Sequence, residues 1–145
     1  MSFKHLSRYE VPKGTVPFVF YQIDGEPSLD CMAATEANRP YHNALLKRNA
    51  KLAQRFRAGR ISREMLERNR DEDRELYARY VVKGWSAVKD DKGKAVPFSA
   101  EACLQFFQAL PNYLFDDLRQ FCTAPMNFVD DDTPDEAAVA EQAGN

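Results

Sequence analysis

A hairpin signal near the N-terminus constrains the fold of this chain more than any other feature. Residues 16–23 are dense in β-branched and aromatic side chains, Asp24-Gly25 follows at once, and residues 28–32 continue with alternating character. An Asp-Gly step between two such runs predicts a β-hairpin, here with a four-residue type of turn. Because an isolated hairpin is only marginally stable in water, its apolar face must pack against helices. Residues 1–15 are polar and are expected to be irregular.

From residue 33 the apolar residues follow the period of an α-helix. One stripe of the predicted first helix consists of Tyr41, Ala44, Leu45, Leu52 and Phe56. Asn38 or Arg39 is expected to cap this helix, with Pro40 in its first turn, and Gly59 to end it.

A second helix is expected from a cap at Ser62 to about Lys83. Up to Glu75 its only large apolar residues are Met65 and Leu66, and charged residues fill most other positions. A helix with so little apolar surface has no face to bury against a core. We therefore expect its first half to be solvated and to project from the body.

Two more helices are expected toward the C-terminus. Ser99 is a good N-cap for the first, Pro111 ends it, and residues 112–122 form the second. The predicted fold class is α+β, mostly α, with the N-terminal hairpin packed on about four helices. A chain of 145 residues has room for one domain, which we place at residues 1–129.

The near-zero net charge of −2 hides a strong segregation of charge. Residues 130–145 contain six acidic residues and no Lys or Arg, and they lack aromatic residues and Leu. Such a segment cannot bury enough surface to offset its ordering entropy, so we expect a disordered acidic tail. Residues 47–70, in contrast, contain nine basic residues and two acidic ones.

No pattern in the sequence predicts an enzyme. Phosphate-binding glycine loops and a nucleophile elbow are absent, and His5 and His42 have no partner at metal-ligand spacing. The acidic pair Asp116-Asp117 would point about 100° apart on a helix. We predict no catalytic residue, no cofactor and no metal. No apolar run is long enough to span a bilayer and no signal peptide is visible, which favours an intracellular protein.

The basic stretch 47–70 leaves one alternative function open. Lys47, Lys51 and Arg55 would share one helical face, which suits contacts with phosphates. The acidic pI of about 5.7 and the absence of a nucleic-acid-binding motif argue against this. A small nucleic-acid-binding or regulatory protein is therefore the second hypothesis.

The segment 80–99 contains a helix end, a Gly-Trp pair, an Asp/Gly turn and a Pro-Phe-Ser helix start. With residues 34–43 and the closing Asn127-Phe128, it resembles the tail assembly chaperones of long-tailed, siphovirus-like bacteriophages. The resemblance covers roughly residues 33–128. The residues that carry it, which we expect to pack as structural residues, are Gly84, Trp85, Pro97, Phe98, Asn127 and Phe128.

The resemblance implies a non-enzymatic role. Such chaperones bind the tape measure protein and recruit tail tube subunits in the host cytoplasm, and they are absent from the finished virion. Contacts with such partners would use exposed apolar patches rimmed by charge. The candidate partner-binding residues are Met65 and Leu66 on the second helix and Phe106 and Phe107 on the third.

Overall fold

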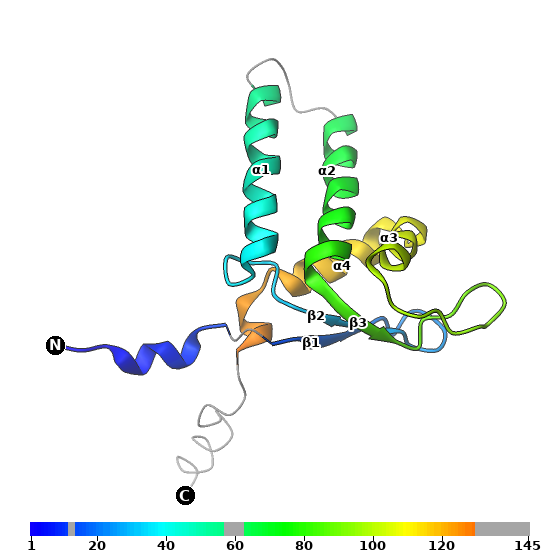
Figure 1. Ribbon diagram of the computed structural model, residues 1–145, viewed down its shortest axis with the longest axis horizontal. Coiled ribbons are helices and arrows are strands. Elements are labelled where there is room, and N and C mark those ends of the chain that lie inside the picture. Colours follow the sequence, from blue (N-terminus) through cyan, green and yellow to red (C-terminus); the bar gives the residue numbers. More distant parts are fainter. Residues whose placement is uncertain (12–13, 57–62, 130–145) are drawn as a thin grey trace, which may run out of the picture.

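The computed structural model of the protein describes residues 1–11, 14–56 and 63–129 (Figure 1). The fold is α+β and mostly helical, as predicted. In chain order, the elements are η1 (Lys4–Tyr9), β1 (Val16–Val19), β2 (Ser28–Cys31), α1 (Arg39–Phe56), α2 (Arg63–Leu76), η2 (Tyr77–Val81), β3 (Val82–Ser86), α3 (Ala100–Ala109), α4 (Asn112–Cys122) and η3 (Pro125–Phe128). The predicted helix end at Gly59, the cap at Ser62 and the acidic tail lie outside the described residues.

The predicted hairpin is present and its register is regular. β1 and β2 pair antiparallel, from Val16 opposite Cys31 to Val19 opposite Ser28. The connection, residues 20–27, is longer than the four-residue type predicted. Its tip closes with a hydrogen bond from the Glu26 N–H to the Ile23 carbonyl, and Gly25 has a positive φ of 85°. The Asp-Gly step therefore marks the turn, as expected from its conformational freedom.

A third strand joins the hairpin, and the sequence analysis assigned its first residues to the end of a helix. β3 pairs antiparallel with β2, which becomes the central strand in the order β1-β2-β3. The chain passes from α2 into β3 through η2, one turn of π-helix. Gly84 lies opposite Asp30, and a Cβ at Gly84 would stand 3.1 Å from Asp30 Oδ2. Because Gly84 has no side chain, the two strands can approach closely at this point.

Asn38 confirms one of the two predicted caps and also links α1 to the π-helical turn. Its Oδ1 accepts a hydrogen bond from the Tyr41 N–H at 3.4 Å, and its Nδ2 donates to the Tyr80 carbonyl at 2.8 Å. The side chain is 2% exposed. A polar group so deeply buried requires partners, and here both ends of the amide are satisfied. The base of α1 is thereby fixed to η2, just before β3 begins.

The core lies between the sheet and helices α3 and α4, with α4 running across the sheet (Figure 1). Its largest fully buried side chains are Tyr77, Phe20, Phe107, Phe115, Phe128, Leu29 and Leu118. Aromatic rings in edge-on or tilted contact connect Tyr41 to Tyr77 (5.7 Å), Tyr77 to Phe115 (5.6 Å) and Phe115 to Phe107 (5.1 Å). These contacts join the base of α1 to α3 and α4.

The three cysteines are free thiols buried in this core. Burial, together with the nearby Cys31, raises the pKa of Cys103 to about 12. A thiol with such a pKa behaves as a small apolar residue at neutral pH. Within the described part of the chain, no helix is both long and apolar enough to cross a membrane.

Candidate functional site

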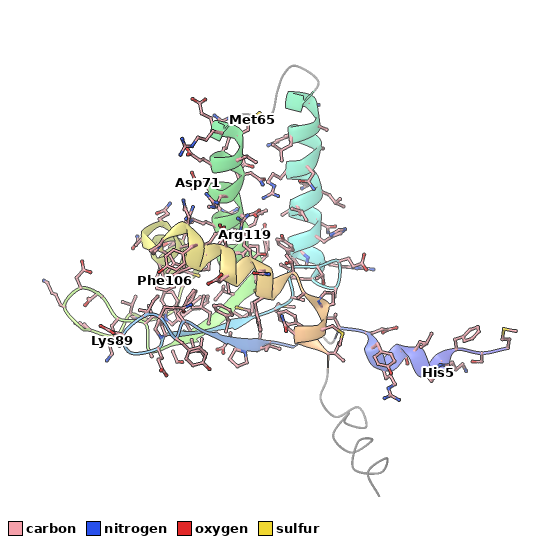
Figure 2. The ribbon with its side chains drawn as sticks, turned by 180° about the vertical axis from the view of Figure 1, so that it is seen from behind. His5, Met65, Asp71, Lys89, Phe106 and Arg119 are labelled. Atoms are coloured by element: carbon pink, nitrogen blue, oxygen red, sulfur yellow. The ribbon has the colours of Figure 1, made fainter. Side chains whose placement is uncertain are left out.

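Helices α1 and α2 stand side by side and project from the body (Figures 1 and 2). We call this pair the α1–α2 arm. Among its described residues beyond the base, 42–54 and 63–72, no side chain is buried. The expectation that the first half of the second helix projects and is solvated is confirmed. The arm is therefore a surface that the protein's own core does not cover.

A hollow of about 280 Å³ lies between the two helices near their base. Its lining residues are Ala44, Lys47, Arg48, Lys51, Glu72, Glu75, Leu76, Arg79 and Tyr80. The charged residues that α1 contributes are all basic, whereas α2 contributes two glutamates. The two helices thus line the hollow with charges of opposite sign, and its lining also includes Leu76 and Tyr80.

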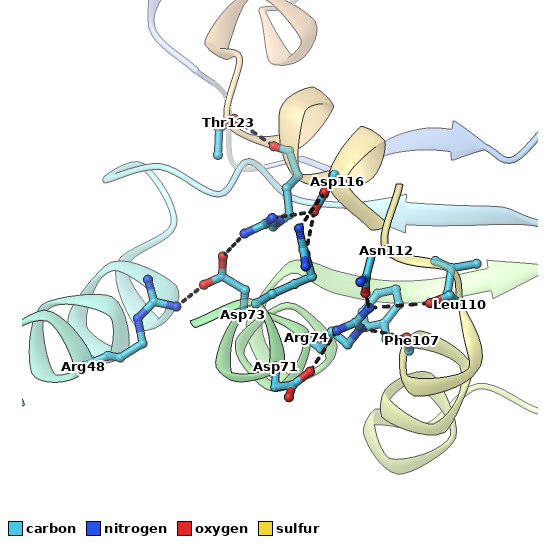
Figure 3. A network of polar contacts seen from close by, with 11 residues as sticks. Arg48, Asp71, Asp73, Arg74, Phe107, Leu110, Asn112, Asp116 and Thr123 are labelled. Atoms are coloured by element: carbon cyan, nitrogen blue, oxygen red, sulfur yellow. Dashed lines mark hydrogen bonds and ion pairs between the residues drawn. The ribbon is translucent and has the colours of Figure 1, made fainter. Parts of the chain in front are cut away.

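A chain of ion pairs fixes the base of the arm to α4 (Figure 3). Asp73 on α2 accepts hydrogen bonds from Arg48 on α1 and from Arg119 on α4, the second at 2.8 Å. Arg119 also donates to Asp116, which receives two further bonds from Arg70 at 3.1 and 3.2 Å. Three helices are therefore joined through two carboxylates. We call these five residues the charge clamp.

Arg74 makes a second attachment on the other side of α2. Its side chain is nearly buried, and its Nε donates to the Phe107 carbonyl at 2.9 Å at the end of α3. Its terminal nitrogens donate to Asn112 Oδ1 at 2.6 Å and to Asp71 at 2.9 Å, and its guanidinium lies 5.0 Å from the Phe115 ring centroid. The Phe107 carbonyl also accepts from the Leu110 N–H, so Arg74 adds a second donor at the end of α3.

Replacing Arg74 with methionine is expected to lower the free energy of unfolding by about 2–4 kcal/mol, because it removes the buried cation whose hydrogen bonds join α2 to the end of α3 and the start of α4. The matched control is Arg68→Met on the exposed part of α2, with an expected change within about 0.5 kcal/mol. Urea denaturation followed by circular dichroism measures both values. Equal effects of the two substitutions would show that Arg74 does not hold α2 to the body.

The charge clamp also sets how stability responds to acid. Partial burial tends to raise the pKa of Asp116, but hydrogen bonds from Arg70 and Arg119 outweigh it and lower that pKa below the ordinary value. A carboxylate with a lowered folded-state pKa stabilises the fold above its unfolded pKa of about 3.9. That stabilisation is lost as the pH falls through the folded-state pKa.

The wild-type protein is therefore expected to lose stability as the pH falls below about 4, and Asp116→Asn to lose less. Asp117→Asn is the charge-matched control, because Asp117 forms no ion pair within the described part of the chain. Thermal unfolding at several pH values measures the difference. If all three proteins show the same acid dependence, the ion pairs of Asp116 do not contribute to stability.

Comparison with known protein families assigns the chain to one of them. The model of the YdaY prophage protein family matches residues 36–138, which is more than half of the sequence. The chain belongs to this family. No curated protein and no solved structure matches significantly. Membership of the YdaY family confirms a phage-derived protein, and tail assembly stays a prediction.

Both helices of the arm lie inside the span that matches the YdaY family, and the predicted partner-binding residues separate into two regions. Leu66 on α2 is 61% exposed and Met65 beside it is half-buried, so this pair lies on the arm. Phe106 and Phe107 both lie on α3, and Figure 2 shows Phe106 away from Met65. The structure does not bring the two pairs together.

The expectation that α3 presents Phe107 on an exposed patch is wrong. Phe107 is fully buried against Phe115, and Phe106 is half-buried among Phe20 (5.8 Å) and Trp85 (5.9 Å). Both rings face the core because α3 covers the sheet, so consecutive aromatic residues at the centre of this short helix pack inward. Of the four candidates, Leu66 is the exposed one.

Of the residues that carry the family resemblance, Trp85, Phe98 and Phe128 pack in or against the core, whereas Pro97 and Asn127 are exposed. Trp85 Nε1 donates to the Val96 carbonyl at 2.8 Å, and its ring contacts Phe98 at 5.3 Å. Asn127 Nδ2 donates to the Phe121 carbonyl at 2.9 Å near the end of α4, and Phe128 is 1% exposed. Exposed Pro97 precedes the Ser99 cap, whose Oγ accepts from the Ala102 N–H at 3.0 Å.

The sequence analysis missed the charge clamp and Arg74. Charged residues fill most of α2, and spacing alone does not distinguish the two inward-facing ones from their solvated neighbours. The expected divergence of Asp116 and Asp117 is correct: Asp116 belongs to the clamp, whereas Asp117 lines a hollow beside β1. Among the described residues, no cluster of three His, Cys, Asp or Glu side chains is arranged to hold a metal ion.

Proposed function

We propose that this YdaY-family protein is a phage tail assembly chaperone that acts by binding rather than by catalysis. In this proposal the α1–α2 arm binds the tape measure protein, and the bound complex recruits tail tube subunits. The protein would act in the host cell cytoplasm and be absent from the finished virion. The observation that carries the proposal is an arm of two long helices that has no buried side chain beyond its base among the residues that the structure describes.

Helices of this kind gain most of their stability from packing an apolar face. The arm leaves Leu46 on α1 and Leu66 on α2 more than half exposed, so each helix has an uncovered apolar side chain that a client helix can pack against. α1 carries basic residues and no acidic one, which favours a client helix with an acidic face. An extended, helical client protein would contain many helices that have an acidic face.

Co-expression of the protein with the tape measure and tail tube proteins encoded nearby tests this proposal. The expected result is capture of the tape measure protein that survives high salt, together with improved solubility of the client. Apolar contacts are insensitive to screening, whereas contacts between exposed charges weaken. Failure to capture either protein would contradict the proposal.

Leu66→Asp is expected to reduce capture at least about tenfold, because it places a charge in the apolar contact. Met126→Asp is the matched control: Met126 is 75% exposed but lies on the body, and capture should be unchanged. Both residues are exposed, so neither substitution disturbs the core. Equal capture by both variants would show that the arm is not the binding surface.

The all-basic character of α1 supports a second candidate, binding of nucleic acid. The two functions differ in their dependence on salt. Binding to phosphates weakens with a log–log slope of about −0.9 for each phosphate contacted on duplex DNA. Copurifying nucleic acid that disappears at high salt, without capture of a tail protein, would favour this second function.

A further inference from the structure

The first ten residues are all exposed and do not pack into the core. η1 (Lys4–Tyr9) contains no buried residue, and the segment extends away from the body, as the position of His5 shows (Figure 2). The sequence analysis expected an irregular segment here, yet it is helical. Its large apolar side chains Phe3, Leu6 and Tyr9 are 60%, 53% and 55% exposed.

These three residues form a stripe. A 3-10 helix has three residues per turn, so positions 3, 6 and 9 lie on one face. Local hydrogen bonds close the turns, from Leu6 N–H to Phe3 O (3.0 Å) and from Glu10 N–H to Ser7 O (3.1 Å). Six residues is long for this type of helix, whose hydrogen-bond geometry is poor. An apolar stripe on such a helix needs a covering surface.

A surface of matching character lies beside the edge strand β1. It is a hollow of about 450 Å³ lined by Pro17, Phe18, Val19, Tyr21, Gln22, Asp117 and Phe121. The Phe18 and Phe121 rings pack at 5.1 Å, and Tyr21 is 73% exposed. The lining is thus mostly apolar, with one carboxylate.

The charges also favour packing of the N-terminal segment against the hollow beside β1. The segment carries Lys4 and Arg8 on the positions between its apolar residues. Asp117 has no ion-pair partner among the residues that the structure describes, and it lies at the hollow. Seating the stripe against Phe18 and Phe121 would place a basic side chain within reach of this carboxylate.

A second copy of the chain satisfies these conditions better than the same copy does. Val11 packs against the core and lies only five positions before Val16, where β1 begins, so little chain separates the segment from the hollow that includes Pro17 on its own copy. In the structure the segment leads outward from Val11 (Figure 1). We propose that the N-terminal segment of one copy packs into the hollow beside β1 of a second copy. Reciprocal exchange closes a two-fold dimer and doubles the buried surface.

Sedimentation velocity over a range of protein concentrations tests this proposal without any client. The wild-type chain is expected to dimerise, and Leu6→Asp on the stripe and Tyr21→Asp in the hollow are each expected to weaken dimerisation at least about tenfold. Ser2→Asp introduces the same charge off the stripe and should dimerise like the wild type. All three positions are exposed, and circular dichroism verifies that the variants fold.

A mixture of the two defective variants gives the decisive result. The intact segment of Tyr21→Asp and the intact hollow of Leu6→Asp form one good contact, so the mixture should associate more strongly than either variant alone. A wild-type chain that stays monomeric at every concentration would overturn the proposal. The proposal would also be overturned if Leu6→Asp dimerised as strongly as the wild type, or if the mixture associated no better than its components. Client binding by the α1–α2 arm is a separate property that none of these outcomes measures.

Discussion

Two adjacent charged residues near the end of α2 hold the projecting arm to the body. Asp73 and Arg74 are 8% and 6% exposed, and they point to different neighbours because consecutive residues of a helix lie about 100° apart. Asp73 binds arginines of α1 and α4, and Arg74 binds the end of α3 and the start of α4. The helices α1, α2, α3 and α4 are therefore joined at this point. Since buried charges are costly unless paired and hydrogen-bonded, both residues need all these partners.

This attachment explains how the protein supports an arm with no core of its own. Apolar packing ends at the aromatic contacts of Tyr41 and Tyr77, and beyond them α1 and α2 present only half-buried and exposed side chains among the described residues. The base is held by directed polar bonds, which leaves the remaining length of both helices available to a partner. A binding role for the arm follows more naturally from this division than a role in stabilising the fold.

The predictable parts of the fold are those with strong local signals. Asp24-Gly25 marks the hairpin tip, Asn38 caps α1 and Ser99 caps α3, each because a local backbone requirement selects the residue type. β3 was missed because Tyr77–Val81 continues the helical spacing of α2, and pairing with β2 is decided by contacts distant in the sequence. In the candidate site, Leu66 was found from its isolation among charges. Phe107 was misjudged, and Asp73 and Arg74 were missed, because which face of a helix meets the body is a tertiary property.

Amide hydrogen exchange with and without the tape measure protein tests the central claim most directly. The account predicts rapid exchange at the distal described residues of the arm, 42–54 and 63–72, and slow exchange at Val81, Phe107 and Phe115 in the free protein. Addition of the client should slow exchange along the arm and leave the core unchanged. Exchange in the arm as slow as in the core, with no change on addition of the client, would contradict the claim that the arm is an uncovered binding surface.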